Sequence, residues 1–384
     1  MSAVLLLSIS VTSRQLLVLF MLAVLILVSD AAEVQDESAM LATSVLEWIR
    51  SQGGFINDKL EIRRMEANNI STPLGVFARA DIQPKEPLIF VPHSCFIALW
   101  DDAVEEDNED EEDGWYYKNL CGLGRLLAKE LKLGSESRYG PYIRYLQAQR
   151  SGQIPATWSD AGKHWLRKIL PTGSDMIDWI KMHFDGTCND VDEYTFALNA
   201  QRGYDSALIP AWDMFNHWNG RVNTENDPMY ANDGQSVRAS THINGGDELY
   251  ATYDECLDCR GGETWRYWGT PEILRDFGFV ERYKQRWVYV EEDIWFEIVE
   301  GGDGGDLVVR WDMSQDDGFG IPDDEGIEFL EEELERVQGV ILEERPADVP
   351  VNEWNTIVEF RNAFTTALSL AIRSAEEYHG NEEL

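Results

Sequence analysis

Apolar residues recur along the chain with spacings that distinguish helical from extended segments. Leu41, Val45 and Ile49 follow the period of a helix, which predicts one over residues 41–50. Residues 88–91 form a short continuous apolar run before Pro92, which predicts a buried strand. A leucine stripe then opens a mainly helical stretch that extends to about residue 198, and its members are Leu123, Leu126, Leu127 and Leu131.

The second half of the chain alternates with a period of two before it becomes helical. Apolar and polar side chains alternate over residues 237–243, a turn sequence follows at Asn244–Asp247, and the alternation resumes over residues 249–253. This pattern predicts a β-hairpin. The sequence also predicts a strand pair around Gly301–Gly305, and two amphipathic acidic helices at Asp323–Glu343 and Val351–His379.

The amino-terminal segment has the pattern of a targeting sequence. Residues 15–28 are almost wholly apolar, Arg14 precedes them, and the small residues Ser29 and Ala31 follow. This run is shorter than the roughly 20 residues of a membrane span, although the apolar character of residues 3–11 leaves a signal anchor open. Residues 1–31 therefore predict a signal peptide or a signal anchor, and with it a secretory or membrane-anchored protein. Within that route, Asn69 would stand in a glycosylation sequon.

The balance of charge limits the partners of the protein. Its 384 residues include 70 Asp and Glu against 32 Lys and Arg, which gives a formal net charge of −38. Such a chain repels polyphosphate, so we expect no direct binding of nucleic acid, whereas basic protein segments would be attracted. Ten of the thirteen residues over 101–113 are acidic, which predicts a solvated loop.

The five cysteines are too few for a disulfide scaffold. Cys256 and Cys259 form a CxxC pair that fits half a metal site, a local disulfide or a redox pair, and Cys95, Cys121 and Cys188 are scattered. A structural zinc would need two further ligands, and the six histidines offer no obvious pair, so no metal site is predicted.

Several motifs occur in a characteristic order along the chain. They are Thr-Pro-Leu-Gly-Val-Phe-Ala at 72–78 continuing to Pro92, Ile-Pro-Ala-Trp-Asp-Met-Phe-Asn-His at 209–217, Gly-Asp-Glu-Leu at 246–249 leading to Tyr253, and Asp-Phe-Gly-Phe-Val at 276–280. In this order they resemble the SET-domain methyltransferases, and most of all the branch typified by the Rubisco large-subunit methyltransferase. Residues 142–146 and 155–158 are similar to the start of the helical insert in that branch. One such motif would be weak, but four in register over about residues 59–287 are strong.

The resemblance implies an α+β fold. It consists of a SET-domain β-fold with small sheets and a pseudoknot, an α-helical insert, and an acidic C-terminal α/β extension. The implied regions are 41–120 for the N-terminal part of the SET domain with the acidic loop 101–113, 121–198 for the insert, 199–286 for the C-terminal part, and 287–384 for the acidic extension.

The resemblance further implies S-adenosyl-L-methionine as cofactor and assigns residues to it. Tyr253 matches the family's catalytic tyrosine, whose hydroxyl orients the acceptor nitrogen and the methyl group. Asn216 and His217 match the pair that holds the cofactor's amino-acid and adenine parts, largely through main-chain and amide groups. Arg202 and Asp213 are similar to positions near the methionyl carboxylate and amine.

Four further residues resemble cofactor-binding positions of the family. Gly75 would permit a close approach between the backbone and the ligand. Glu86 and Leu88 align with a segment that carries additional contacts, and Phe279 aligns with the aromatic ring that packs on adenine.

The implied activity is transfer of a methyl group to a side-chain nitrogen of a protein, with lysine as the expected acceptor. Such transfer needs an unprotonated nitrogen in line with the S–CH3 bond, and burial of the amine favours that form. Histidine methylation is a close variant. A SET-like binding module without catalysis is a different class. Pro73, which stands where the family usually has its first glycine, and the signal-like start favour it, whereas the presence of Tyr253 with Asn216 and His217 argues against it. We expect a monomer with a protein substrate, possible membrane contact through residues 1–31 only, and no metal.

Overall fold

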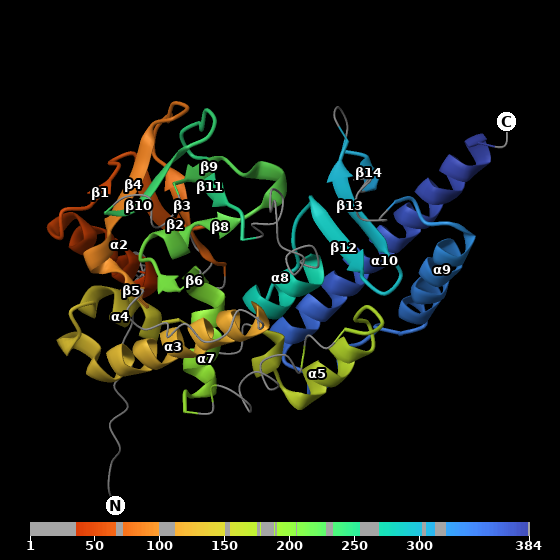
Figure 1. The fold of residues 1–384 in the computed structure, drawn as a ribbon, viewed down its shortest axis with the longest axis horizontal. Helices are drawn as coiled ribbons and strands as arrows, with labels where there is room; N and C mark the ends of the chain where they lie inside the picture. Colours follow the sequence, from red (N-terminus) through yellow and green to blue (C-terminus); the bar gives the residue numbers. More distant parts are fainter. Residues whose placement is uncertain are drawn as a thin grey trace, which may run out of the picture.

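The computed structural model describes residues 36–66, 72–99, 112–149, 154–174, 177, 188, 190–204, 206–227, 233–253, 269–301, 305–311 and 320–382. Several predicted features lie outside the described residues: the targeting segment 1–31, the sequon at Asn69, most of the acidic stretch 101–113, and the Cys256–Cys259 pair. In Figure 1 the strands that precede residue 252 lie on the left, and the strands after residue 284 lie on the right with the last two helices.

Among the described residues before position 252, the strands form three small sheets. The first has the order β1 (Phe55–Ile56), β4 (Pro87–Pro92), β10 (Gly234–Ala239) and β9 (Thr224–Asn226). The second has the order β2 (Leu60–Arg64), β3 (Leu74–Ala78), β11 (Glu248–Ala251) and β8 (Asn216–His217), with β8 parallel to β11. The third consists of β5 (Ile97–Ala98), β7 (Ala207–Leu208) and β6 (Gly203–Tyr204). The predicted small sheets are confirmed, and each joins segments that lie far apart in the sequence.

Helix α2 (Glu37–Ser51) confirms the first predicted helix. The carboxylate of Asp36 caps it by accepting hydrogen bonds from the main-chain N–H groups of residues 38 and 39 at 3.1 and 3.4 Å. Its buried stripe of Ala42, Val45 and Ile49 packs into the core between the sheets. The predicted strand at residues 88–91 is confirmed as β4, which lies between β1 and β10.

The predicted hairpin over residues 237–253 is wrong, although both of its strands exist. β10 pairs with β4 and β9, whereas β11 pairs with β3 and β8. Between them Ile243 forms a bridge with Ile82, and Gly246 turns the chain with a φ of 97°. The period of two correctly predicted extended backbone, but the choice of neighbour depends on distant strands that local pattern does not encode.

Helices follow the first strands, as predicted for the insert. They are α3 (Glu112–Leu133), α4 (Gly140–Gln147), α5 (Asp160–Arg167) and α7 (Glu193–Arg202). α3 packs against α7, and α4 packs against α2. In contrast, the apolar residues of α5 join the C-terminal core, and residues of α3 and α7 also form a third, smaller apolar cluster.

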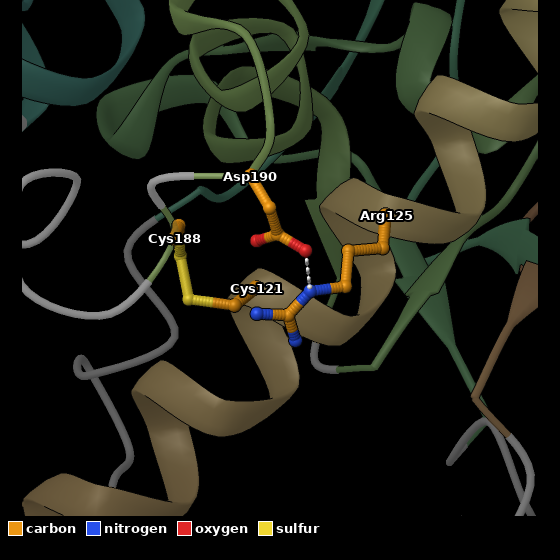
Figure 2. Close-up of a disulfide and its surroundings, with 4 residues drawn as sticks. All are labelled: Cys121, Arg125, Cys188 and Asp190. Atoms are coloured by element: carbon orange, nitrogen blue, oxygen red, sulfur yellow. Dashed lines mark hydrogen bonds and ion pairs between the residues drawn. A yellow bond between two sulfur atoms is a disulfide. The ribbon is translucent and has the colours of Figure 1, made fainter.

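A disulfide connects the two ends of this helical region. Cys121 on α3 is bonded to Cys188, which precedes α7, and both residues are 1% exposed (Figure 2). Beside it Arg125 Nε donates a hydrogen bond to Asp190 Oδ2 at 2.6 Å, and this ion pair lowers the pKa of the Asp190 carboxyl (Figure 2). The sequence did not predict this disulfide, because the two cysteines are 67 positions apart and only folding brings them together.

The C-terminal region combines a three-stranded sheet with helices. Its elements are α8 (Thr270–Phe277), β12 (Gln285–Tyr289), β13 (Ile294–Glu300), β14 (Leu307–Trp311), α9 (Asp324–Gln338) and α10 (Val351–Glu382). The predicted strand pair and both predicted helices are therefore confirmed. Trp287 of β12 stacks on Phe364 of α10 at 4.9 Å between ring centroids and fixes the sheet to the helix.

Two acidic side chains of the C-terminal helices hold the α5 segment in place. Glu353 of α10 accepts hydrogen bonds from the hydroxyl and the main-chain N–H of Ser159, at 2.6 and 3.0 Å. Glu333 of α9 accepts corresponding bonds from Thr172. Both carboxylates are nearly buried and satisfied, so part of the acidity of this region has a packing function. Among the described helices, none has both the length and the apolar composition of a membrane span.

We expect replacement of Cys121 and Cys188 by serine to destabilise the protein. The disulfide closes a loop of 67 residues, and the chain-entropy relation gives a loss of about 4 kcal/mol in the free energy of unfolding. Denaturant unfolding of the parent and the double variant, both in oxidising buffer, measures the difference. A loss below about 1 kcal/mol would contradict the disulfide as a stabilising link.

Candidate active site

A cavity of about 900 Å³ lies where the second sheet, α4, α8 and α10 come together. Five of the proposed cofactor-binding residues line it: Arg202, Asp213, Asn216, His217 and Phe279. The predicted catalytic Tyr253 lines it as well. These residues come from segments up to 77 positions apart, between 202 and 279. The fold therefore collects most of the candidate site in one place.

Tyr253 lies two residues beyond the end of β11, and hydrogen bonds fix both its hydroxyl and its main-chain N–H. Its hydroxyl donates a hydrogen bond to the main-chain oxygen of Phe215 at 2.8 Å, and its main-chain N–H donates to Nδ1 of His217 at 2.9 Å. The ring packs against Phe277, with 4.5 Å between the centroids. Burial raises the pKa of the Tyr253 phenol above its ordinary value, against an opposing effect of Arg202. The site therefore presents a neutral phenol whose orientation is set by main-chain groups.

Both ring nitrogens of His217 have partners within the protein. Nδ1 accepts the bond from Tyr253, and Nε2 lies 2.8 Å from Oε1 of Glu281. The side chains of His217 and Glu281 are 1% and 2% exposed. The imidazole is thus engaged in the fold, and a ligand at this position would meet the main chain of β8 rather than the ring nitrogens.

Asn216 joins three strands of the second sheet. Its side-chain Nδ2 donates to the main-chain oxygen of Leu74 at 2.9 Å and to Oε1 of Glu248 at 2.6 Å. The second carboxylate oxygen of Glu248 accepts a bond from the hydroxyl of Tyr250 at 2.7 Å. Since both amide hydrogens of Asn216 are used in this way, its Oδ1 is the atom that remains for a ligand.

Gly75 makes this arrangement possible, in a different way from the one expected. A Cβ atom at this position would collide with Oε1 of Glu248 and would lie 2.8 Å from Nδ2 of Asn216. The glycine was predicted to admit a ligand close to the backbone. The structure shows instead that it admits the Asn216–Glu248 pair, and Gly75 itself is not among the residues that line the cavity.

Arg202 and Asp213 form an ion pair in the wall of the cavity. The guanidinium donates to Oδ2 of Asp213 at 3.2 Å and to its main-chain oxygen at 3.0 Å, and their side chains are 17% and 3% exposed. The hydroxyl of Tyr142 on α4 donates to the same Oδ2 at 2.9 Å. Oδ1 of Asp213 is buried without a hydrogen-bond partner among the described residues. Burial raises the pKa of the Asp213 carboxyl, and the charge of Arg202 opposes this rise.

The aromatic part of the cavity comes from the C-terminal end of α8. Gly278 ends the helix in the left-handed conformation with a φ of 80°, which only glycine adopts without strain. Phe277 and Phe279 therefore flank the turn, and the ring of Phe279 lies 6.1 Å from that of His217. Together they offer an apolar surface suited to a flat ring.

Glu86 and Leu88 lie outside the cavity. Glu86 accepts bonds from Lys59, Asn57 and the main-chain N–H of Gln83, and these bonds lower the pKa of its carboxyl to about 2. Leu88 is a residue of β4 and is fully buried in the core. The structure thus assigns a turn and a core position to these two residues and does not bring them to the other predicted site residues.

Other residues of the cavity were missed by sequence reasoning. Tyr145 and Gln149, on and just after α4, both contact Arg202, which connects the insert directly to the site. The similarity of residues 142–146 to the start of the family's insert was a signal for Tyr145, and no signal marked Gln149. Further lining residues come from segments with no chemical motif, namely Arg64, Met65, Arg282, Asn352, Thr356 and Glu359.

The geometry favours alignment of reactants over covalent catalysis. The cavity combines a fixed neutral hydroxyl, a main-chain carbonyl, an Arg–Asp pair and aromatic rings. Such groups orient a polar ligand and stabilise its charges without forming a bond to it.

Comparison with known proteins identifies the fold. A family model of the SET domain matches residues 74–254. The structure of Rubisco LSMT bound to AdoMet superimposes with a TM-score of 0.51 at 13% identity, over 88% of this chain and 92% of that one. The SET domain of LSMT bound to lysine and AdoHcy gives 0.50 at 12% identity, over 88% and 91% of the two chains. No curated protein matches in sequence. Residues 74–254 thus match the SET-domain family model, and the chain shares with LSMT a fold of small sheets and helices.

We expect Gly75→Ala to destabilise the protein, because the added methyl group displaces Glu248 and Asn216. Overpacking of this kind costs about 1–3 kcal/mol in the free energy of unfolding, and denaturant unfolding measures it. Gly124→Ala in α3 is the control, since its Cβ would be 3.5 Å from Val191, an ordinary contact, and alanine favours the helix by about 0.5–1 kcal/mol. Equal free energies of unfolding for the two variants would contradict a steric constraint at Gly75.

Proposed function

We propose that this protein is an S-adenosylmethionine-dependent protein methyltransferase that modifies a lysine side chain. One observation carries the proposal: Tyr253, whose phenol is fixed by Phe215 and whose main chain is fixed by His217, lines a cavity together with the Arg202–Asp213 pair. The similar structures support the choice of ligands, since they contain LSMT bound to AdoMet or AdoHcy, and to lysine or monomethyllysine.

The residues of the cavity suit the chemical groups of the methyl donor. Oδ1 of Asp213, which has no hydrogen-bond partner among the described residues, and Oδ1 of Asn216 can accept hydrogen bonds from an ammonium group. Arg202 supplies donors for a carboxylate, and Phe279 offers a ring face to adenine. When bound, the donor would supply an electrophilic methyl group on a sulfonium.

Within this proposal the protein acts by orientation and desolvation. The hydroxyl oxygen of Tyr253 and the neighbouring main-chain oxygens accept weak C–H···O contacts, which hold a methyl group in line with the acceptor nitrogen. A buried site penalises the charged form of the acceptor amine, so the lone pair needed for attack becomes available. The neutral phenol of Tyr253 suits this role, because a phenolate would instead favour a charged amine.

Replacement of Tyr253 by phenylalanine tests the proposal directly. The variant keeps the ring packing and deletes the hydroxyl, so single-turnover methyl transfer should fall by about 10²-fold, which corresponds to about 2.7 kcal/mol in the transition state. Calorimetry should show little change in donor affinity, and stability should change by about 1 kcal/mol.

Tyr194→Phe is the matched control, since its hydroxyl also donates to a main-chain oxygen, that of Gln149 at 3.2 Å, but Tyr194 does not line the cavity. We expect this variant to transfer methyl groups at nearly the parent rate. Label transfer from S-adenosylmethionine into a host-cell extract, followed by identification of the modified residue, distinguishes lysine from histidine. Parent protein that neither binds the donor nor transfers label would contradict the enzyme and favour a binding module.

We also propose that the protein enters the secretory pathway. Two independent features support this: the pattern of residues 1–31, and the disulfide between Cys121 and Cys188, a bond that persists in oxidising compartments.

Protein isolated from its own type of cell should then begin near Ala32 and contain the Cys121–Cys188 disulfide. Amino-terminal sequencing and non-reducing peptide mapping provide the measurements. An intact Met1 together with free thiols at both cysteines would contradict secretion, whereas retention in carbonate-washed membranes would indicate an anchor.

A further inference from the structure

The carboxylate of Glu281 is a buried group that the mechanism above does not use. It lies between α8 and β12, its side chain is 2% exposed, and no Lys or Arg of the described residues forms an ion pair with it. Instead it accepts hydrogen bonds from three side chains: His217 Nε2 at 2.8 Å, Asn219 Nδ2 at 3.0 Å and Thr270 Oγ1 at 2.6 Å. A buried carboxylate held only by such donors is costly to retain unless it serves a specific arrangement.

The bonds around His217 determine where its proton lies. Nδ1 accepts the main-chain N–H of Tyr253, so this nitrogen carries no hydrogen. In a neutral imidazole the hydrogen must then be on Nε2, where Glu281 accepts it. Loss of the carboxylate would remove one of the two contacts that favour this tautomer and leave only the N–H of Tyr253. In the other tautomer a hydrogen on Nδ1 would face the N–H of Tyr253, and two donors repel.

We propose that Glu281 is a positioning residue for methyl transfer: by fixing the tautomer of His217 it aims Tyr253. The chain of contacts is continuous from Glu281 through His217 to the main chain of Tyr253, and the phenol then reaches the carbonyl of Phe215. The rings of His217 and Tyr253 lie 5.2 Å apart, so a rotation of the imidazole also displaces the phenol. The expected effect on the rate rests on the proposed function, whereas the assignment of the tautomer does not.

Three variants separate positioning from simple support of the fold. Glu281→Leu removes every acceptor, whereas Glu281→Gln retains one oxygen that can accept from His217. Thr270→Val is the control, because it deletes a bond to the other carboxylate oxygen and leaves the contact with His217 intact. Thermal melting shows how far each variant is destabilised.

The first measurement is the imidazole ¹⁵N spectrum of protein labelled at its six histidines, with His217→Gln used to assign the signal. The parent, the Gln variant and the Thr270→Val control should show hydrogen on Nε2 of His217, and Glu281→Leu should show a mixture of tautomers. The second is transfer of radiolabel from S-adenosylmethionine into a host-cell extract. Glu281→Leu should lose about tenfold or more in rate with donor affinity nearly unchanged, and the Gln and Val variants should stay within about threefold of the parent.

Hydrogen on Nδ1 of His217 in the parent would overturn the inference, and so would an unchanged tautomer or an unchanged rate in Glu281→Leu. A rate in Thr270→Val that falls as far as that in Glu281→Leu would reduce Glu281 to a purely structural role and also overturn it. If the parent transfers no label, the proposed function fails, and the ¹⁵N spectra alone decide whether Glu281 sets the tautomer.

Discussion

The arrangement of the site depends on a tight polar contact within the second sheet. Glu248 of β11 is 7% exposed, and its carboxylate binds the amide of Asn216 on β8 and the hydroxyl of Tyr250. Only a residue without a side chain at position 75 leaves room for this contact. Because β8 also carries His217 and β11 leads to Tyr253, the same contact sets the spacing of the residues around the cavity. The buried carboxylate of Glu248 therefore determines the geometry of the residues around the cavity.

Local pattern in the sequence predicted most elements of the fold but not their partners. The helix over residues 41–50, the strand before Pro92 and the two acidic C-terminal helices follow from periodicity, because each has one apolar face. The pairing of β10 with β4, and of β11 with β3, depends on residues about 150 positions away. Periodicity does not record such distances, so the hairpin was the natural and incorrect interpretation.

The candidate site shows the same division. Motifs that stand at strand ends, with Asn216, His217 and Tyr253, predicted residues that the fold does bring together. Glu86 and Leu88 were inferred from alignment alone, and the structure uses them for a turn and the core. Glu281 and Tyr145 gave no signal of their own, since a single acidic or aromatic residue in a sequence does not reveal whether it is buried against a functional group.

The pairing of β5 with β7 has a consequence for how such a protein can change. These two short strands bring Ala98 and Ala207 together and enclose more than a hundred residues of intervening chain. The entropy of closing a loop grows only with the logarithm of its length, so doubling that chain would cost about 0.6 kcal/mol. The length of the enclosed segment therefore has little effect on the free energy of pairing β5 with β7. The segment can be lengthened, shortened or exchanged during evolution while the sheets remain. Among its restraints are the side chains of Tyr142 and Tyr145, through which it contacts Asp213 and Arg202.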